Sequence, residues 1–168
     1  MNYFENLNKY SLFDNLTKKQ IEKFHSLIKI AEYKPNELII KEGEPGDFMF
    51  LLIKGEVEIT KIMTLSLNKS DEDTREKSFI RLSNKDYPFI GEMSFVQNKE
   101  KRSASVKAID NCVIGKIYNN DLTELLENNN EIGYKLMNNI ARKIANDLRI
   151  TNKNILKLTT ALSLVLEE

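Results

Sequence analysis

The chain has few of the residues that build metal centres and disulfides. Its 168 residues include one cysteine, one histidine and no tryptophan. A single cysteine cannot form an intrachain disulfide, and one histidine cannot form the multi-histidine cages that bind zinc or iron. The sequence also lacks a run of about 18 apolar residues and an N-terminal basic stretch followed by an apolar one. We therefore expect a cytoplasmic protein with no bound metal, no signal peptide and no membrane span.

The chain carries no excess of charge of either sign. Its 25 Lys and Arg residues balance 25 Asp and Glu residues, so no long-range field would attract nucleic acid or an anionic surface. The proportions of hydrophobic residues, 41%, and charged residues, 30%, are those of a folded globular protein. The length suits one ordinary domain, which we expect over 1–168. Any anion must then be captured by local geometry.

A helix is predicted over 17–30. Thr17 and Gln20 have the spacing of a capping box, which marks a helix N-terminus. Four apolar residues then share one face of the helix: Ile21, Phe24, Leu27 and Ile28. His25 lies beside this face without a nucleophile or an acid as partner, and we interpret it as a surface residue.

Between 31 and 118, short apolar or alternating segments are separated by turn residues, including Gly43–Asp47 and Gly55. Expected strands cover 38–40, 48–53, 57–59, 79–82, 103–109 and 112–117. Regular short antiparallel strands favour a jelly-roll β-barrel. Cys112 is expected in its core, and the charged segment 66–76 is expected to be an exposed hairpin extension.

A long C-terminal helix is predicted over 130–165. One seam of the helix is almost entirely apolar and contains Met137, Ile140, Ile144, Leu148, Thr151, Ile155, Leu158, Leu162 and Val165. The spacing is strictly heptad from Leu148 onward, which is typical of a left-handed coiled coil. At about 1.5 Å per residue the helix exceeds the diameter of a small barrel. We expect a parallel homodimer; the alternative is a helix that packs wholly on its own barrel.

The same helix is rich in positive charge. Between Tyr134 and Lys157 it carries six basic residues and one acidic residue, a pattern compatible with nucleic-acid binding. The solvated faces of a coiled coil have a similar charge pattern, and we favour that interpretation.

The segment Tyr87–Val96 has the features of an anion-binding turn. Gly91 permits close approach of the backbone, and the helix-like turn after it presents free N–H groups. Arg102 follows ten residues after Glu92; its guanidinium can bind two phosphate oxygens, and the Ser103 hydroxyl can add a donor. A buried Glu92 would accept a hydrogen bond from a sugar hydroxyl and orient Arg102. As bare residue types, however, Glu and Arg at this spacing more often form a surface ion pair.

Four segments together resemble the cyclic-nucleotide-binding domain: Gly43–Asp47, Phe50–Val57, Gly91–Ser94 and Arg102–Val106. Their order and spacing are similar to those of the bacterial catabolite activator protein family, over roughly residues 10 to 157. The resemblance implies that Glu92 binds the ribose 2′-hydroxyl and Arg102 the cyclic phosphate, assisted by backbone amides. The ligand-binding residues expected in this way are Gly91, Glu92, Met93, Ser94, Arg102, Ser103, Thr151 and Asn152.

The last two of these residues lie on the long helix, where a Thr-Ser or Thr-Asn pair of the family contacts the purine from the two subunits. Thr151 is also the one polar residue of the predicted seam. A polar side chain in such a seam costs stability unless it finds a partner. Thr151 could contact the base or fix the register of a dimer, and both interpretations stay open.

The sequence departs from the family in three places. The family's glycine before the phosphate-binding turn is missing from 84–90, and Lys101 stands where a proline is usual. After Leu158 only 159–168 remain, which leaves no room for a helix-turn-helix. We therefore do not expect sequence-specific DNA binding.

These patterns predict a non-enzymatic receptor for a cyclic nucleotide, cAMP in preference to cGMP. It would signal through its C-terminal helix to an unknown downstream protein and use no cofactor. cGMP stays open because Ser103 could also contact a guanine amino group. The alternative is a ligand-free structural dimerisation scaffold with a degenerate pocket. A metal-dependent enzyme on a double-stranded barrel is disfavoured, because such sites use several histidines.

Overall fold

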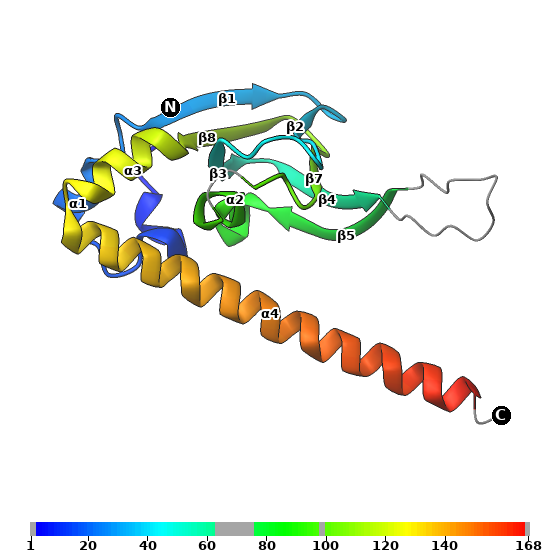
Figure 1. Cartoon of the computed structure of the whole chain (residues 1–168). Helices are drawn as coiled ribbons and strands as arrows, with labels where there is room; N and C mark the ends of the chain where they lie inside the picture. The colour runs from blue at the N-terminus through cyan, green and yellow to red at the C-terminus, as the bar shows by residue number, and fades with distance from the viewer. Residues whose placement is uncertain (1–2, 63–75, 98–99, 167–168) are drawn as a thin grey trace.

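Two four-stranded antiparallel sheets form the body of the molecule (Figure 1). The structure, a computed structural model, describes residues 3–62, 76–97 and 100–166. The first sheet has the order β1 (Ile28–Tyr33), β8 (Cys112–Tyr118), β3 (Phe48–Lys54), β6 (Phe89–Ile90). The second has the order β2 (Leu38–Ile40), β7 (Ser105–Ala108), β4 (Glu56–Ile62), β5 (Glu76–Ser83). The predicted jelly-roll fold is confirmed, as two separate sheets in place of one closed barrel.

Strand β3 shows how the sequence builds two cores. Successive side chains of a strand point to opposite faces, and four consecutive residues of β3 are fully buried. Met49 and Leu51 join the core formed with the N-terminal segment and the C-terminal helices. Phe50 and Leu52 join the core between the two sheets. The apolar run in β3 is therefore continuous because both of its faces are covered.

The N-terminal segment is less helical than predicted. It contains the short 3-10 helices η1 (Leu7–Lys9) and η2 (Ser11–Phe13) and the helix α1 (Lys18–Glu22). The capping box of Thr17 and Gln20 forms, but the prediction of a helix over 17–30 is wrong beyond Glu22. Ile28 begins β1 and pairs with Ile117 of β8, so sheet pairing there replaces the helical hydrogen bonds.

Short helical segments complete the body of the molecule. They are η3 (Asn84–Asp86), α2 (Glu92–Val96) and α3 (Asn119–Glu127). Cys112 is buried as predicted, and burial raises the pKa of its thiol to about 11. The predicted exposed extension over 66–76 lies outside the described residues, apart from Glu76 at the start of β5.

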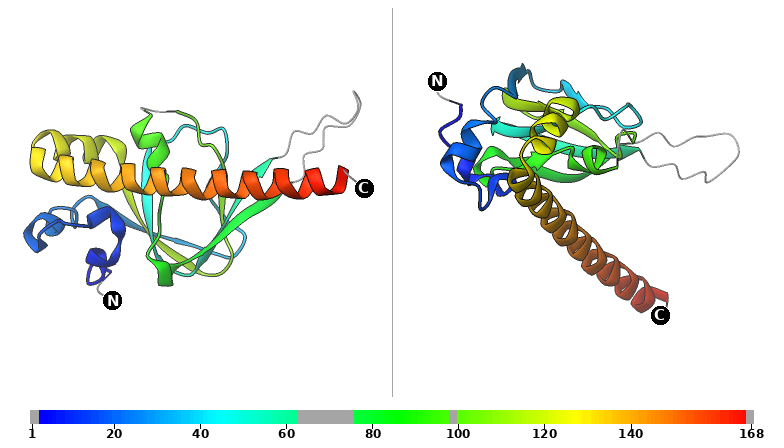
Figure 2. Two further views of the ribbon diagram at one scale, coloured as in Figure 1. Left: turned by 90° about the horizontal axis from the view of Figure 1, so that it is seen from below. Right: turned by 60° about the vertical axis from the view of Figure 1, so that its left-hand side comes forward.

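The long C-terminal helix is confirmed as α4 (Asn130–Leu166). Its N-terminal half packs on the body through the buried residues Ile132, Leu136 and Ile140, which recur every four residues on one face. Asn139, also buried, donates hydrogen bonds to the carbonyls of Leu12 and Asp14. Figure 2 shows the helix running across the molecule and then leaving it.

The predicted seam of α4 is not one continuous face. Ile140 and Ile144 pack on the chain's own body, whereas Met137 is 38% exposed. From Leu148 onward every described residue of α4 is exposed. Within the described residues, no helix combines the length and the apolar character that a membrane span requires.

Candidate functional site

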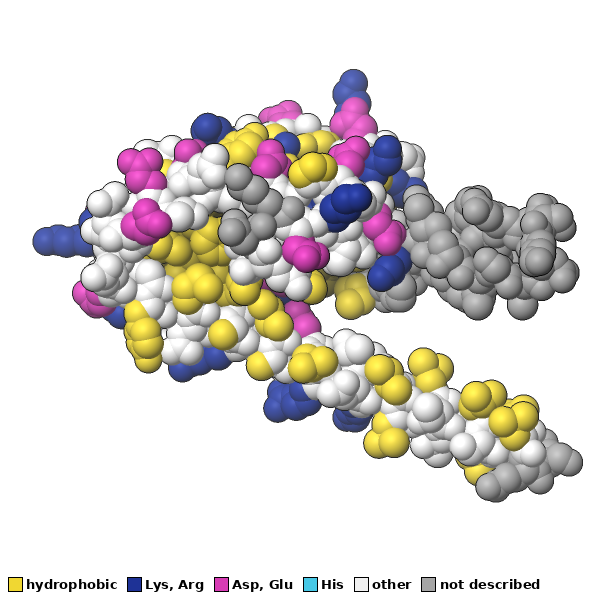
Figure 3. Space-filling view, in the orientation of Figure 1, with side chains coloured by type: hydrophobic (Ala, Val, Ile, Leu, Met, Phe, Trp, Pro, Cys, Tyr) yellow, Lys and Arg dark blue, Asp and Glu magenta, His cyan; other side chains and the backbone are white. Residues whose placement is uncertain are grey.

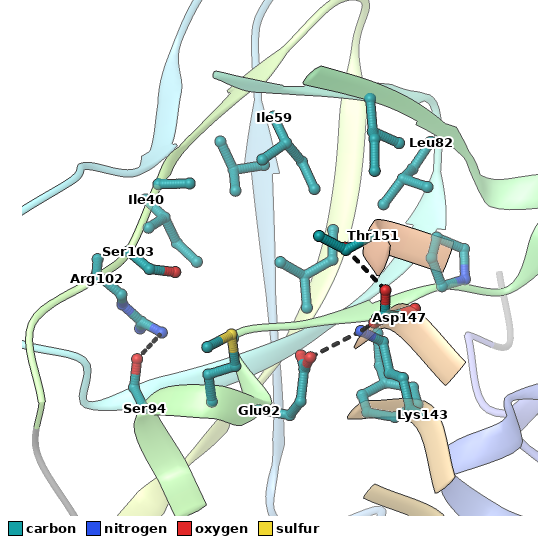
Figure 4. Close-up of a pocket in the computed structure, with 18 of the residues that line it drawn as sticks. Ile40, Ile59, Leu82, Glu92, Ser94, Arg102, Ser103, Lys143, Asp147 and Thr151 are labelled. Atoms are coloured by element: carbon teal, nitrogen blue, oxygen red, sulfur yellow. Dashed lines mark hydrogen bonds and ion pairs between the residues drawn. The ribbon is translucent and has the colours of Figure 1, made fainter. Parts of the chain in front are cut away.

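A cavity of about 400 Å³ lies between the second sheet, α2 and α4 (Figure 4). Its apolar wall includes Ile40, Ile59, Leu82 and Val106 from the second sheet. Its polar groups come from the segments around α2 and Arg102 and from α4: Glu92, Ser94, Arg102, Ser103, Lys143, Asp147, Thr151 and Asn154. The cavity therefore has an apolar side and a polar side, with a helix across its opening.

Arg102 is a buried cation at one end of the cavity, with 5% of its surface exposed. Its Nη2 donates to the carbonyl of Phe48 at 2.6 Å, and its Nη1 donates to Ser94 Oγ at 3.3 Å. The guanidinium also lies over the Phe48 ring, 4.8 Å from the centroid, and 3.9 Å from the Asp47 carboxylate. Burial lowers the pKa of Arg102 and Asp47 opposes that shift; arginine's ordinary pKa is so high that the charge remains at neutral pH.

The glycine-rich turn Gly43–Asp47 holds Arg102 in place. Gly43 N donates to the carbonyl of Arg102 at 2.9 Å, and Arg102 N donates to the carbonyl of Glu44 at 2.8 Å. A Cβ on Gly46 would lie 2.2 Å from the Cβ of Ser94. The turn can approach α2 this closely because residue 46 is glycine.

The turn into α2 depends on Gly91. This residue has a φ of 95°, in the left-handed region that favours glycine. A Cβ here would also lie 2.8 Å from Nη1 of Arg102 and 3.1 Å from the Phe48 carbonyl oxygen. The first turn of α2 thus begins beside the arginine, and its leading N–H groups have no acceptor within the helix.

Glu92 does not contact Arg102, contrary to prediction. Its Oε1 accepts a hydrogen bond from Lys143 Nζ of α4 at 2.7 Å, and no hydrogen bond or ion pair between the described residues joins it to Arg102. The physical reason is that the Arg102 guanidinium donates its hydrogen bonds to the Phe48 carbonyl and to Ser94 Oγ. The cation that reaches Glu92 is instead Lys143 of α4. Burial lowers the pKa of Lys143, but the carboxylates of Glu92 and Asp147 together outweigh it and raise the pKa.

Most of the residues expected from the sequence come together in this cavity. Those that line it are Gly91, Glu92, Met93, Ser94, Arg102, Ser103 and Thr151. Asn152 is exposed on α4 and is not among the lining residues. Thr151 Oγ1 donates to the carbonyl of Asp147 at 2.9 Å, so a polar residue in the seam is satisfied within its own helix.

Sequence reasoning missed Lys143 and Asp147 as pocket residues. Their spacing of four residues on a helix predicts the ion pair that they form, at 2.8 Å. This spacing does not predict the hydrogen bond from Lys143 to Glu92, because that contact depends on how α4 crosses the sheets. The finished site offers a buried guanidinium, a carboxylate bound to an ammonium, and an apolar wall. This arrangement suits a ligand with an anionic group, a hydroxyl and a flat apolar part.

Comparisons with known proteins agree with this geometry. The model of the family described as "Cyclic nucleotide-binding domain" matches residues 30–129, which include α2, α3 and both sheets except the first two residues of β1, but not α4. A crystal structure of a cyclic nucleotide-binding domain from Methylobacillus flagellatus KT is similar with a TM-score of 0.76 and 25% identity, covering 92% of this chain and 83% of that chain.

Two curated relatives contain this domain within longer chains. The cAMP-activated global transcriptional regulator CRP of Pasteurella multocida is 30% identical over 140 residues, which cover 83% of this chain and 62% of the relative. The isozyme 2 cGMP-dependent protein kinase, forms cD5/T2, of Drosophila melanogaster is 26% identical over 165 residues, which cover 95% of this chain and 17% of the relative. The chain thus spans less than two thirds of the length of either relative. Because the family model covers more than half of its residues, the chain belongs to the cyclic nucleotide-binding domain family.

Proposed function

We propose that the domain is a receptor for cAMP, that it catalyses no reaction, and that it signals through α4 to another protein. The proposal rests mainly on one observation: the guanidinium of Arg102 is buried at the end of a cavity whose lining is otherwise largely apolar. Burying a cation is costly unless hydrogen bonds or an anion compensate it, and the nearest carboxylate among the described residues, that of Asp47, is 3.9 Å away and largely exposed. A cyclic phosphate is the anion that the family and the size of the cavity suggest.

The ligand's parts correspond to the groups that line the cavity. Arg102, Ser103 and the backbone amides of the α2 turn would bind the phosphate. Glu92 would accept a hydrogen bond from the ribose 2′-hydroxyl. The purine would lie against the apolar wall, with Thr151 at its edge.

Signalling would follow from the position of α4. The helix contributes Lys143, Asp147 and Thr151 to the cavity, so a bound nucleotide would contact both the body and the helix. A ligand shifts a conformational equilibrium toward the arrangement that it binds more tightly. The position of α4 is therefore the proposed output.

We extend the proposal to a parallel homodimer through the C-terminal half of α4. Figure 3 shows apolar side chains along this half, and large residues there are exposed, for example Leu158 at 71% and Val165 at 69%. Such residues at heptad spacing indicate a coiled-coil partner. Asn152, exposed at the middle of α4, would then contribute to the partner's pocket, as the resemblance implies.

Titration calorimetry with cAMP and with cGMP tests the receptor proposal. The relatives' names include both nucleotides, so the comparison of the two ligands decides the preference that we assign to cAMP. Arg102→Ala should weaken binding by a factor of roughly 10 to 100, because a charge-assisted hydrogen bond contributes about 1.5 to 3 kcal/mol. Arg102→Lys keeps the charge in case the alanine variant unfolds. Arg81→Ala, on an exposed arginine paired with Glu58, is the control and should bind as the wild type does.

Two outcomes would contradict the receptor proposal. Equal binding by Arg102→Ala and wild type would remove the phosphate role of the arginine. No heat with either nucleotide, together with a dimeric mass by light scattering, would favour the alternative of a dimerisation scaffold. The hydrogen-bond partners that Arg102 already has within the protein are the observation that favours this alternative.

We assign the protein to the cytoplasm and assign no sequence-specific DNA binding to residues 1–168. Two of the basic residues on α4 are already neutralised within the chain, Lys135 by Glu131 at 2.6 Å and Lys143 by Glu92. This pairing reduces the positive stripe that a DNA backbone would need. Strong, salt-sensitive retention on heparin would contradict the assignment.

A further inference from the structure

Lys143 lies between two carboxylates at the opening of the pocket. Its Nζ is 2.7 Å from Glu92 Oε1 and 2.8 Å from Asp147 Oδ2. The Glu92 side chain is 7% exposed, whereas that of Asp147 is 53% exposed. A buried carboxylate without a partner is strongly unfavourable. Lys143 is the one hydrogen-bond partner of the Glu92 carboxylate among the described residues, so Glu92 depends on it far more than Asp147 does.

The same ammonium joins α4 to the phosphate-binding turn. Other polar side chains of α4 reach the N-terminal segment: Asn139 donates to the carbonyls of Leu12 and Asp14, and Lys135 donates to Gln20. Of the described residues of α4, Lys143 alone donates to α2. The position of the Glu92 carboxylate is therefore set by a helix that the family model does not include.

We infer that Lys143 is a positioning residue for Glu92, which makes α4 part of the ribose subsite. The inference rests on the proposed function. An ionised carboxylate has two oxygens and about four lone-pair sites. Lys143 occupies one oxygen, Oε1, which leaves Oε2 to accept a hydrogen bond from the ligand hydroxyl. Ammonium and hydroxyl thus bind Glu92 together, and a ligand that binds Glu92 engages α4 through Lys143.

The test compares cAMP with 2′-deoxy-cAMP, which lacks the hydroxyl that Glu92 would bind. Calorimetry on the wild type should show that the deoxy ligand binds roughly tenfold or more weakly, the effect of one hydrogen bond to a charged group. Lys143→Met should weaken cAMP binding about tenfold and leave binding of the deoxy ligand nearly unchanged. Lys143→Arg should restore most of the preference for cAMP.

Lys135→Met is the matched control. Lys135 lies on the same helix, has a similarly exposed side chain (22% against 27% for Lys143), and pairs with a carboxylate four residues away on the helix, Glu131. It does not line the pocket, so its removal should leave both affinities and their ratio unchanged. Thermal unfolding of each variant shows whether the fold is retained, and Lys143→Gln replaces Lys143→Met if that variant unfolds.

The remaining outcomes overturn the inference in distinguishable ways. Tighter cAMP binding by Lys143→Met would mean that the ammonium competes with the ligand hydroxyl. An equal loss for both ligands would mean that Lys143 only holds the helix in place. A wild type that binds both ligands equally would remove the role of Glu92 while leaving phosphate recognition intact. A wild type that binds neither ligand would overturn the proposed function itself.

Discussion

The two halves of α4 have the same secondary structure and opposite surroundings. The N-terminal half buries Ile132, Leu136 and Ile140 in a core shared with the N-terminal segment and β3. The C-terminal half exposes its large apolar residues, including Leu148 at 58%. The change falls between Ile144 and Leu148, within the stretch from Lys143 to Asn154 that lines the pocket. The helix thus packs on the body up to Ile144, and its exposed half begins alongside the pocket.

The two halves of α4 therefore differ in what they contribute to the stability of this chain. The anchored half supplies stability to this chain, and the exposed half contributes almost none within it. A ligand in the proposed site would contact α4 where the helix changes from packed to exposed.

Ile140→Ala should lower the free energy of unfolding by about 2 to 5 kcal/mol, because it leaves a cavity in a fully buried site. Leu158→Ala, at 71% exposure, should change the free energy by less than about 0.5 kcal/mol at dilutions where a dimer dissociates. Urea unfolding of both variants measures the contrast. Equal destabilisation would contradict the division of the helix.

Gly46→Ala should destabilise the fold by about 1 to 3 kcal/mol and weaken ligand binding, because its Cβ would overlap the Ser94 side chain at 2.2 Å. The effect would show that the glycine-rich turn supports the Arg102 side of the pocket. Urea unfolding and calorimetry with cAMP measure the two effects.

Gly43→Ala is the control for this prediction. Gly43 has a φ of 82° and nothing within 4 Å of an added Cβ. Gly43→Ala should therefore cost only the strain of a left-handed backbone, about 1 to 2 kcal/mol, and weaken ligand binding less than Gly46→Ala does. A larger loss of affinity at residue 43 than at residue 46 would refute the role given to Gly46.

The smallest expected effect is a dependence of stability on alkaline pH. The pKa of Lys143 is raised in the folded state, so its pairing contributes fully below the ordinary lysine value of 10.5 and is lost as the pH rises through the folded value. The difference in free energy of unfolding between wild type and Lys143→Met should be constant from about pH 7 to about pH 10 and shrink above that. A difference that grows in alkali would contradict the assigned pairing.

Local patterns predicted much of the fold. The capping box at Thr17, the glycine turns and the long apolar periodicity each correspond to an observed feature, because short-range geometry determines them. The helix predicted over 17–30 failed because Ile28 pairs with Ile117 of β8, 89 residues away along the chain. A local pattern cannot report such a partner.

The part of the site around Gly91 and Arg102 could be predicted from the sequence, whereas the part on α4 could be predicted only partly. Gly91, Glu92 and Arg102 lie within twelve residues, and a family resemblance identified them. The Lys143–Glu92 pair joins residues 51 apart and depends on the crossing of α4 over the sheets. That crossing is set by the packing of Ile132 and Leu136, which residue spacing along the chain does not encode.

Hydrogen exchange with and without cAMP tests the central claim most directly, since it reports on both sides of the pocket in one experiment. We expect cAMP to slow exchange in α2 and in the part of α4 that lines the cavity, from Lys143 to Asn154, while leaving Ile28–Tyr33 of β1 unchanged. Unchanged exchange in both segments at saturating cAMP would contradict the claim that this cavity is a cyclic-nucleotide site. Slowing in α2 alone would contradict the coupling to α4.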